Sequence, residues 1–171
     1  MKKNNGYIFW ITGLSGAGKT SLAKLIKKKI EFDYGKTILL NGDDLREIFK
    51  FNTYSKNERK KLALSYSRLC LFLSKQGFNV IFTVVGLFHE IHKFNRKFLK
   101  NYLEIFIKSD VKKIISMKKK KTYKNKSNIV GIDIKAEYPI KPHIIIKNNF
   151  TKPLDIISDE LYKKIKKNIN E

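Results

Sequence analysis

The 171-residue chain is poor in cysteine, and its apolar runs are short. A single cysteine, Cys70, excludes an intramolecular disulfide and is consistent with a reducing compartment. Cys70 lies within the apolar pattern 69–73, so we expect a small buried hydrophobe rather than a nucleophile. No apolar run approaches the length of a membrane span, and no secretory apolar region precedes Tyr7. We therefore expect a cytoplasmic protein without a membrane partner.

Acidic residues and arginine are also scarce. The 37 lysines and arginines outnumber 15 acidic residues and give a formal net charge of +22. Arginine occurs only at Arg46, Arg59, Arg68 and Arg96, so the excess is almost entirely lysine, spread along the chain. No zinc-ligand spacing or RNA-binding aromatic motif accompanies the lysines. We expect this field to attract polyanionic nucleotides rather than a specific nucleic acid.

The size and the hydrophobic pattern predict one α/β domain over residues 1–171. With 42% hydrophobic content, the chain can bury one substantial core and is too short for two ordinary domains. Near-continuous apolar runs, typical of strands in a parallel sheet, lie at 7–12, 37–40, 80–85, 103–107 and 144–147. Helical patterns lie at 21–31, 45–51, 56–76, 91–100, 111–117 and 153–168. This alternation predicts a three-layer fold with right-handed crossovers.

The first expected strand leads into a phosphate-loop motif. Residues 13–20 read G-L-S-G-A-G-K-T and match G-x-x-x-x-G-K-[ST], between a strand and a helical stretch. Glycines let backbone N–H groups face phosphate oxygens, Lys19 can reach the β- and γ-phosphates, and Thr20 offers a hydroxyl to Mg²⁺. We expect the nucleotide-binding residues to be Gly13, Ser15, Gly16, Ala17, Gly18, Lys19, Thr20 and Ser21. The motif predicts a P-loop NTPase fold.

Two aspartates follow the second expected strand, at the sheet edge where open α/β folds bind ligands. The sequence there is Asn41-Gly42-Asp43-Asp44, and Arg46 comes shortly after. Phosphoryl transfer to an alcohol needs a group that accepts or orients the acceptor proton, and cations that follow the charge. Asp43 and Arg46 can supply both, although the aspartates could instead cap the helix beginning near Leu45.

Other sequence motifs, present or missing, narrow the class of nucleotide-binding protein. The chain has no guanine-reading N-K-x-D and no D-x-x-G after a suitable strand, which disfavours a GTPase. His89 and His92 lack a further ligand at metal-site spacing, and His143 is expected to be structural. Residues 118–142 show no helical or strand period, so we expect a lid or binding loop, with a basic insertion as the alternative.

Five motifs occur in an order that resembles the adenylylsulfate kinase family, from Trp10 to about Lys152. They are the phosphate loop at 13–20, a D-G-D-N-[IV]-R counterpart at 41–46, an F-S-x-x-x-R counterpart at 54–59, a K-G-L-Y-K counterpart at 120–124 and an F-T-G-I-D counterpart at 129–133. The resemblance implies phosphorylation of a ribose 3′-hydroxyl with ATP and Mg²⁺, a lid over two nucleotides, and a homodimer.

The same resemblance implies roles for individual residues. Asp43 would be the catalytic carboxylate, assisted by Lys19, and Thr20 would contact the metal. Arg46 and Arg59 would bind the anionic end of the acceptor. The implied acceptor-binding set is Asp43, Arg46, Tyr54, Arg59, Val85, Lys120 and Ile129, with Tyr54 and Ile129 on the two sides of the base.

The chain departs from the family pattern mainly on the acceptor side. The departures are Asn41 for an aspartate, Leu62 for an asparagine, residues 86–89 for S-P-Y-R, and Ile129 for an aromatic. Residues 88–91 and 95–96 resemble a branch that phosphorylates cytidine diphosphoramidate. The family as a whole favours adenylylsulfate as the acceptor, cytidine diphosphoramidate is the alternative, and a non-catalytic nucleotide- or RNA-binding module is a remote third.

Overall fold

A computed structural model describes residues 5–51, 55–117 and 129–171. Its centre is a five-stranded parallel sheet in the order β2-β3-β1-β4-β5. The strands are β1 (Ile8–Gly13), β2 (Thr37–Asn41), β3 (Asn79–Val84), β4 (Tyr102–Lys108) and β5 (Ile144–Lys147). The five strands predicted from the apolar runs are confirmed, with ends that differ by at most one residue.

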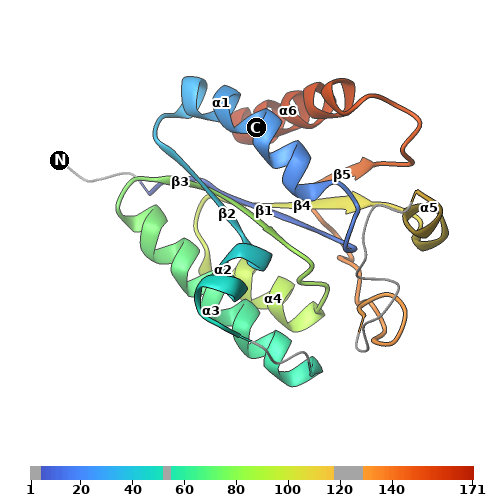
Figure 1. Ribbon diagram of the computed structural model, residues 1–171. Coiled ribbons are helices and arrows are strands. Elements are labelled where there is room, and N and C mark those ends of the chain that lie inside the picture. Colours follow the sequence, from blue (N-terminus) through green and yellow to red (C-terminus); the bar gives the residue numbers. More distant parts are fainter. Residues whose placement is uncertain (1–4, 52–54, 118–128) are drawn as a thin grey trace.

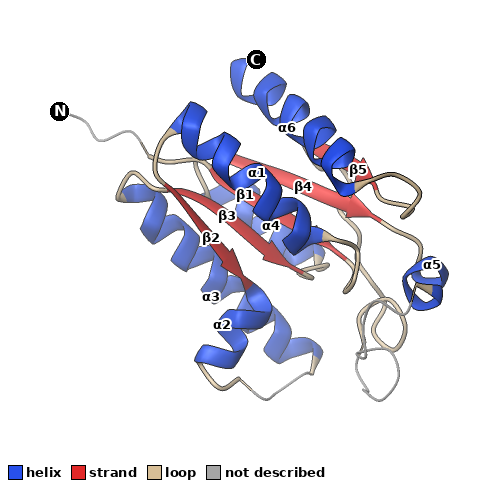
Figure 2. Cartoon of the chain, turned by 45° about the horizontal axis from the view of Figure 1, so that its top comes forward, coloured by secondary structure: helices blue, strands red, loops and turns tan. Residues whose placement is uncertain are grey.

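Helices cover both faces of the sheet (Figures 1 and 2). They are α1 (Lys19–Tyr34), α2 (Gly42–Ile48), α3 (Lys56–Lys75), α4 (His89–Phe98), α5 (Val111–Ser116) and α6 (Leu154–Asn170). The pair α1 and α6 packs on one face, while α3 and α4 pack on the other. The three-layer α/β prediction is therefore confirmed.

The core is deepest at β1 because this strand is central in the sheet and covered on both faces. All six of its residues are buried. On the α3 and α4 side, the Trp10 ring stacks on Phe82 with centroids 4.8 Å apart, and Tyr66 of α3 packs against Phe82. Cys70 is fully buried on α3, and burial raises the pKa of its thiol, as a packing role requires. In the described ranges, no helix is long and apolar enough to span a membrane.

The start of α2 differs from the sequence prediction. The helix begins at Gly42 rather than near Leu45, because Asn41 at the end of β2 caps it by accepting a hydrogen bond from the Asp43 N–H at 3.2 Å. The Asn41 side chain also donates to Asp44 Oδ1 at 3.0 Å. The capping alternative for the aspartates is therefore wrong, since Asn41 supplies the cap.

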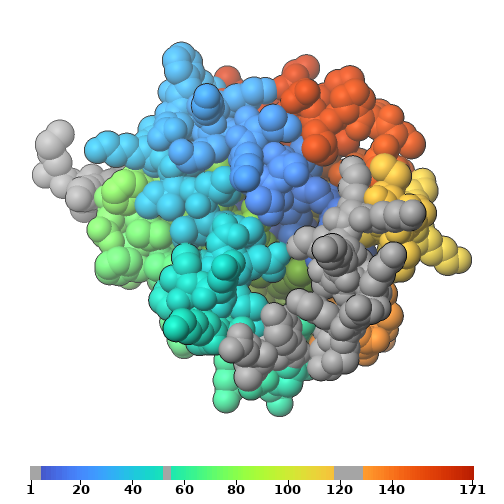
Figure 3. Space-filling view, in the orientation of Figure 1, coloured from blue at the N-terminus to red at the C-terminus, as the bar shows by residue number. Residues whose placement is uncertain are grey.

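The carboxyl ends of β1, β2 and β3 meet at one edge of the sheet, where the phosphate loop, α2 and the segment leading to α4 follow (Figure 2). In Figure 3, the blue segment that includes the phosphate loop lies beside the cyan segment that includes α2. The two motifs singled out in the sequence thus occupy neighbouring positions, as expected for parallel strands.

Candidate functional site

The phosphate loop connects the buried end of β1 to the first turn of α1. Gly18 precedes this helix with φ of 92°, and a Cβ there would lie 2.8 Å from the Asn148 amide nitrogen. Both facts require glycine at this position. Lys19 is buried, and its ammonium donates to the Leu14 carbonyl at 2.7 Å. The lysine therefore reaches back over the loop that it is expected to serve.

A pocket surrounds the loop, which we call the phosphate-loop pocket. Its lining residues are Ser15, Gly16, Gly18, Lys19, Thr20, Ser21, Asn41, Asp43, Thr83, Val84, Val85, Asn148, Phe150 and Leu154. Most of the nucleotide-binding residues expected from the sequence lie here. Gly13 and Ala17 do not line the pocket, because Gly13 ends β1 and Ala17 is fully buried under the loop.

Asn148 and Phe150 are pocket residues that the sequence reasoning missed. The buried Asn148 side chain donates to the Ala17 carbonyl at 3.0 Å and accepts from the Phe150 N–H at 3.1 Å. These two bonds hold the segment after β5 against the phosphate loop. No sequence motif marks this pair. A usable signal was their position directly after β5, at the carboxyl edge of the sheet.

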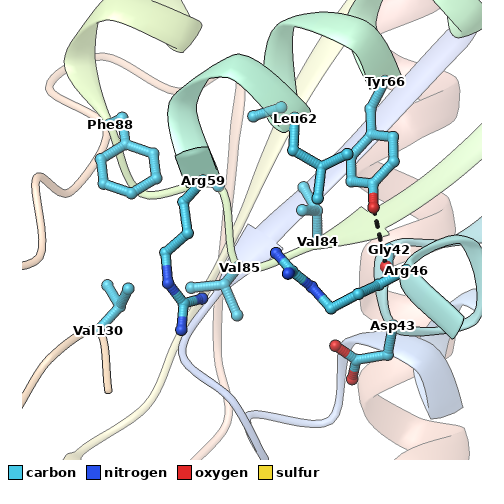
Figure 4. A pocket seen from close by; sticks show the side chains of 12 residues that line it. Gly42, Asp43, Arg46, Arg59, Leu62, Tyr66, Val84, Val85, Phe88 and Val130 are labelled. Atoms are coloured by element: carbon cyan, nitrogen blue, oxygen red, sulfur yellow. Dashed lines mark hydrogen bonds between the residues drawn. The ribbon is translucent and has the colours of Figure 1, made fainter. Parts of the chain in front are cut away.

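A second pocket, the arginine pocket, lies beside the first between α2, α3 and the segment after β3 (Figure 4). Its lining residues are Gly42, Asp43, Arg46, Arg59, Leu62, Ala63, Tyr66, Val84, Val85, Gly86, Phe88 and Val130. Figure 4 shows the guanidinium groups of Arg46 and Arg59 extending into it from two different helices. The apolar wall is formed by Leu62, Phe88, Val130 and the valines.

Hydrogen bonds fix two sides of the arginine pocket. Arg46 donates from Nη1 to the Phe51 carbonyl at 3.2 Å, which anchors the guanidinium near the end of α2. The Tyr66 hydroxyl donates to the Gly42 carbonyl at 3.2 Å and ties α3 to the start of α2 (Figure 4). Burial raises the pKa of Tyr66 to about 12, so the hydroxyl keeps its proton and remains a donor. The positions of Arg46 and Asp43 are therefore set by packing against α3.

The two pockets share a boundary. Asp43, Val84 and Val85 line both of them. The Asp43 carboxylate thus lies where a group bound at the phosphate loop would meet a group bound beside the arginines. This is the arrangement required for direct transfer between two ligands, with one carboxylate placed at the junction.

The residues present fit a magnesium ion at this junction. Thr20 and Asp43 both line the phosphate-loop pocket and offer hydroxyl and carboxylate oxygens. Mg²⁺ prefers oxygen ligands and usually takes one or two from the protein, with nucleotide phosphates and water completing the set. Among the described residues, no group of three or more His, Cys, Asp or Glu side chains could hold a metal ion. A shared protein–nucleotide site therefore suits the chain better than a cage built of protein ligands.

One expected acceptor residue, Ile129, does not line the arginine pocket. Tyr54 and Lys120 fall outside the described residues. Ile129 is buried, and its neighbour Val130 lines the arginine pocket instead. Tyr66, also missed, lies seven residues after Arg59 on α3 with Leu62 and Ala63 between them. That helical spacing was a signal for one shared face.

The histidines bind backbone groups rather than one another. The backbone N–H of His89 donates to Glu137 Oε2 at 2.9 Å, and the ring Nε2 of His89 lies 2.9 Å from the Tyr138 carbonyl. His92 is buried and bonds to the Gly86 carbonyl. His143 accepts the Glu104 N–H at 2.8 Å, in keeping with a structural role. A metal pair at His89 and His92 has no support from this geometry.

Comparison with known proteins gives a consistent group of relatives. The sequence model of a family described as adenylylsulphate kinase matches residues 5–147. A cytidine diphosphoramidate kinase of Campylobacter jejuni is 38% identical over 167 residues, covering 93% of this chain and 98% of that protein. An adenylyl-sulfate kinase of Clostridium acetobutylicum is 32% identical over 155 residues, covering 86% of this chain and 77% of that protein.

Solved structures show the same fold. A Mycobacterium tuberculosis APS kinase in complex with AMPPNP and APS superposes with a TM-score of 0.84 at 22% identity. The match covers 95% of this chain and 98% of that one. At this identity the likeness establishes the architecture, a P-loop fold with a parallel sheet, and nothing about the ligands of this chain.

Proposed function

Because the chain belongs to the adenylylsulphate kinase family, we propose that it transfers the γ-phosphoryl group of ATP to the ribose 3′-hydroxyl of cytidine diphosphoramidate. The observation that carries the choice of acceptor is the 38% identity to a cytidine diphosphoramidate kinase across 98% of that protein. The adenylyl-sulfate kinase of Clostridium acetobutylicum is 32% identical across a smaller share. Adenylylsulfate, the acceptor that the family name favours, thus becomes the second candidate.

The two pockets take separate parts in this reaction. ATP phosphates bind the backbone of the phosphate loop, and the Lys19 ammonium exchanges the Leu14 carbonyl for phosphate oxygens. The acceptor occupies the arginine pocket, where Arg46 and Arg59 pair with its anionic 5′ group. This assignment places the reacting hydroxyl beside Asp43, on the boundary of the two pockets.

Asp43 then handles the proton. Its carboxylate accepts the proton of the 3′-hydroxyl while the oxygen forms a bond to the γ-phosphorus and the bond to ADP breaks. The Lys19 ammonium stabilises the negative charge that develops on the leaving phosphate. Mg²⁺, bound through Thr20 and Asp43 oxygens, would neutralise phosphate charge at this junction. Leu62, Phe88 and Val130 exclude water from the sugar and base of the acceptor.

Adenylylsulfate remains a candidate on specific grounds. The family model covers most of the chain, and both acceptors are nucleotides with an anionic 5′ group that two arginines can bind. A non-catalytic nucleotide- or RNA-binding module is the remote alternative. The homodimer expected from the resemblance belongs to the same proposal, and a monomer mass in sedimentation equilibrium would count against it.

One assay tests the acceptor. ADP release is measured with cytidine diphosphoramidate and with adenylylsulfate at matched concentrations, using wild-type enzyme and Lys19→Ala as the catalytically disabled control. We expect kcat/KM to be at least about tenfold higher for the cytidine compound, equivalent to about 1.4 kcal/mol of transition-state binding. A preference for adenylylsulfate would favour the second candidate. If neither compound causes ADP release, the non-catalytic binding module becomes the favoured function.

A further inference from the structure

A buried polar cluster lies between α4 and β4, behind the wall of the arginine pocket. His92 and Asn95 of α4 and Glu104 of β4 are at most 2% exposed. In the described part of the chain, four buried side-chain atoms lack a hydrogen-bond partner, and His92 Nδ1, Asn95 Oδ1 and Glu104 Oε1 are three of them. Unpartnered polar atoms in a core are costly, so such a concentration calls for a functional reason.

His92 connects this cluster to the arginine pocket. Its Nε2 lies 3.0 Å from the carbonyl oxygen of Gly86, a residue that lines the pocket. A carbonyl oxygen can only accept a hydrogen bond, so Nε2 must carry the proton. Burial lowers the pKa of His92 to about 4, which agrees with a neutral ring bearing its proton on Nε2. The bond therefore has a defined direction and a defined tautomer.

Gly86 has a backbone conformation and surroundings that require glycine. Its φ is 42°, and a Cβ at this position would lie 2.9 Å from Val84 Cγ1 and 3.7 Å from Trp10 Nε1. The Gly86 carbonyl also accepts the Phe88 N–H at 3.0 Å, which closes a tight turn before α4. Thr12 on β1 donates to the neighbouring Val85 carbonyl. The pocket wall at 85–88 is thus held from β1 on one side and from α4 on the other.

Glu104 and Arg96 lie on the far side of the imidazole. Arg96 Nε donates to Glu104 Oε2 at 2.8 Å, and Glu104 Oε1 lies 3.9 Å from His92 Nδ1. Glu104 of β4 pairs with Trp10 in the sheet register and therefore faces the same side of the sheet, toward α4. The ring of His92 is confined between this carboxyl group and the Gly86 carbonyl.

We propose that His92 is a positioning residue for the acceptor: buried beside the Glu104–Arg96 pair, it fixes the Gly86 carbonyl and so keeps Gly86 and Phe88 in place around the arginine pocket. His92 lines neither pocket and acts only through the wall. Its loss should impair acceptor binding and leave ATP binding intact. This inference rests on the proposed kinase function.

The kinetic test compares three variants. His92→Leu removes the donor, His92→Gln retains an N–H donor at a similar reach, and Tyr102→Phe is the matched control. Tyr102 lies in the same layer, where its hydroxyl accepts from Asn95 Nδ2 at 3.4 Å, without touching Gly86. We expect His92→Leu to raise the acceptor KM about tenfold with an unchanged KM for ATP, and His92→Gln to recover to within about threefold of wild type. Equal changes in both KM values, or no recovery in His92→Gln, would overturn the proposal.

A spectroscopic test needs no catalysis. In ¹⁵N spectra of the wild-type protein at pH 7, His92 should show a protonated Nε2 and a bare Nδ1. Compared with wild type, amide exchange at 86–88 should be at least about tenfold faster in His92→Leu and only slightly faster in His92→Gln. In Tyr102→Phe it should be unchanged. A proton on Nδ1, or equal exchange in all variants, would refute the positioning role. Failure of the proposed kinase function would be seen separately, because the wild-type protein would then be inactive with both acceptors.

Discussion

Asn148→Ala tests whether the segment after β5 is part of the nucleotide site. Asn148 is 1% exposed and makes two hydrogen bonds to backbone, to the Ala17 carbonyl and from the Phe150 N–H. Alanine removes both and leaves the two backbone groups in a buried region. Each loss costs about 1–2 kcal/mol when the partner stays unsatisfied, so the folded state should lose about 2–4 kcal/mol.

That loss is measurable in two ways. For a chain of this length, 2–4 kcal/mol lowers Tm by about 4–16 °C in calorimetry. Because Asn148 holds Phe150 beside the phosphate loop, the KM for ATP should also rise at least about fivefold. The acceptor KM should not change, since Asn148 does not line the arginine pocket.

A matched control separates stability from binding. Asn79 is 2% exposed and binds three backbone groups, accepting from the Tyr7 N–H and donating to the Tyr34 and Gly35 carbonyls. It lies at the start of β3, at the opposite edge of the sheet from both pockets. Asn79→Ala should destabilise the protein to a similar extent with normal KM for ATP. If both variants raise that KM equally, the role of Asn148 in the nucleotide site is refuted.

Other predictions concern the junction, the loop and the buried histidine. Asp43→Asn should lower kcat at least about tenfold while ATP still binds in calorimetric titration, and normal turnover would remove Asp43 from the chemical step. Gly18→Ala should weaken ATP binding at least about tenfold, because a Cβ would lie 2.8 Å from Asn148 at φ of 92°, and unchanged affinity in the same titration would contradict this. Burial lowers the pKa of His92 to about 4 from 6.5, so the unfolded chain takes up its proton first as the pH falls. The contribution of His92 to the free energy of unfolding is therefore fully present above pH 6.5 and is lost as the pH falls toward 4. At about 1.4 kcal/mol per pKa unit, the total loss is about 3 kcal/mol. Urea unfolding of wild type and His92→Gln should show their difference shrinking over that range, and a constant difference would rule this out.

Much of the fold was predictable because its signals are local. The phosphate loop occupies eight consecutive residues, and each strand is a short apolar run, so period and motif identify them without tertiary information. Asp43 and Arg46 could be proposed as site residues for the same reason, since they follow a strand at the ligand edge. The predicted start of α2, near Leu45, lies three residues after the observed start, because the helix cap, Asn41, is also the last residue of β2.

The acceptor side was harder to predict because residues 129–142, the described part of the expected loop 118–142, have little regular structure. An isolated bridge joins Val130 to Ile134, and the Ile129 N–H donates to Asp133 Oδ2 at 2.8 Å. In such a turn no period tells which side chain faces a pocket. The resemblance pointed to Ile129, whereas the structure puts Val130 in the wall.

The sequence by itself determined that this chain binds phosphate groups on a P-loop and which family it joins, since those properties depend on neighbouring residues. Tertiary structure alone decided that Asn148 lines the phosphate-loop pocket and bonds to Ala17, 131 positions earlier in the chain. It also decided that His92 of α4 bonds to the Gly86 carbonyl in the wall of the arginine pocket, with Glu104 of β4 on the other side of its ring. Contacts of this kind depend on how helices and strands pack across the sheet, and no spacing along the chain encodes them.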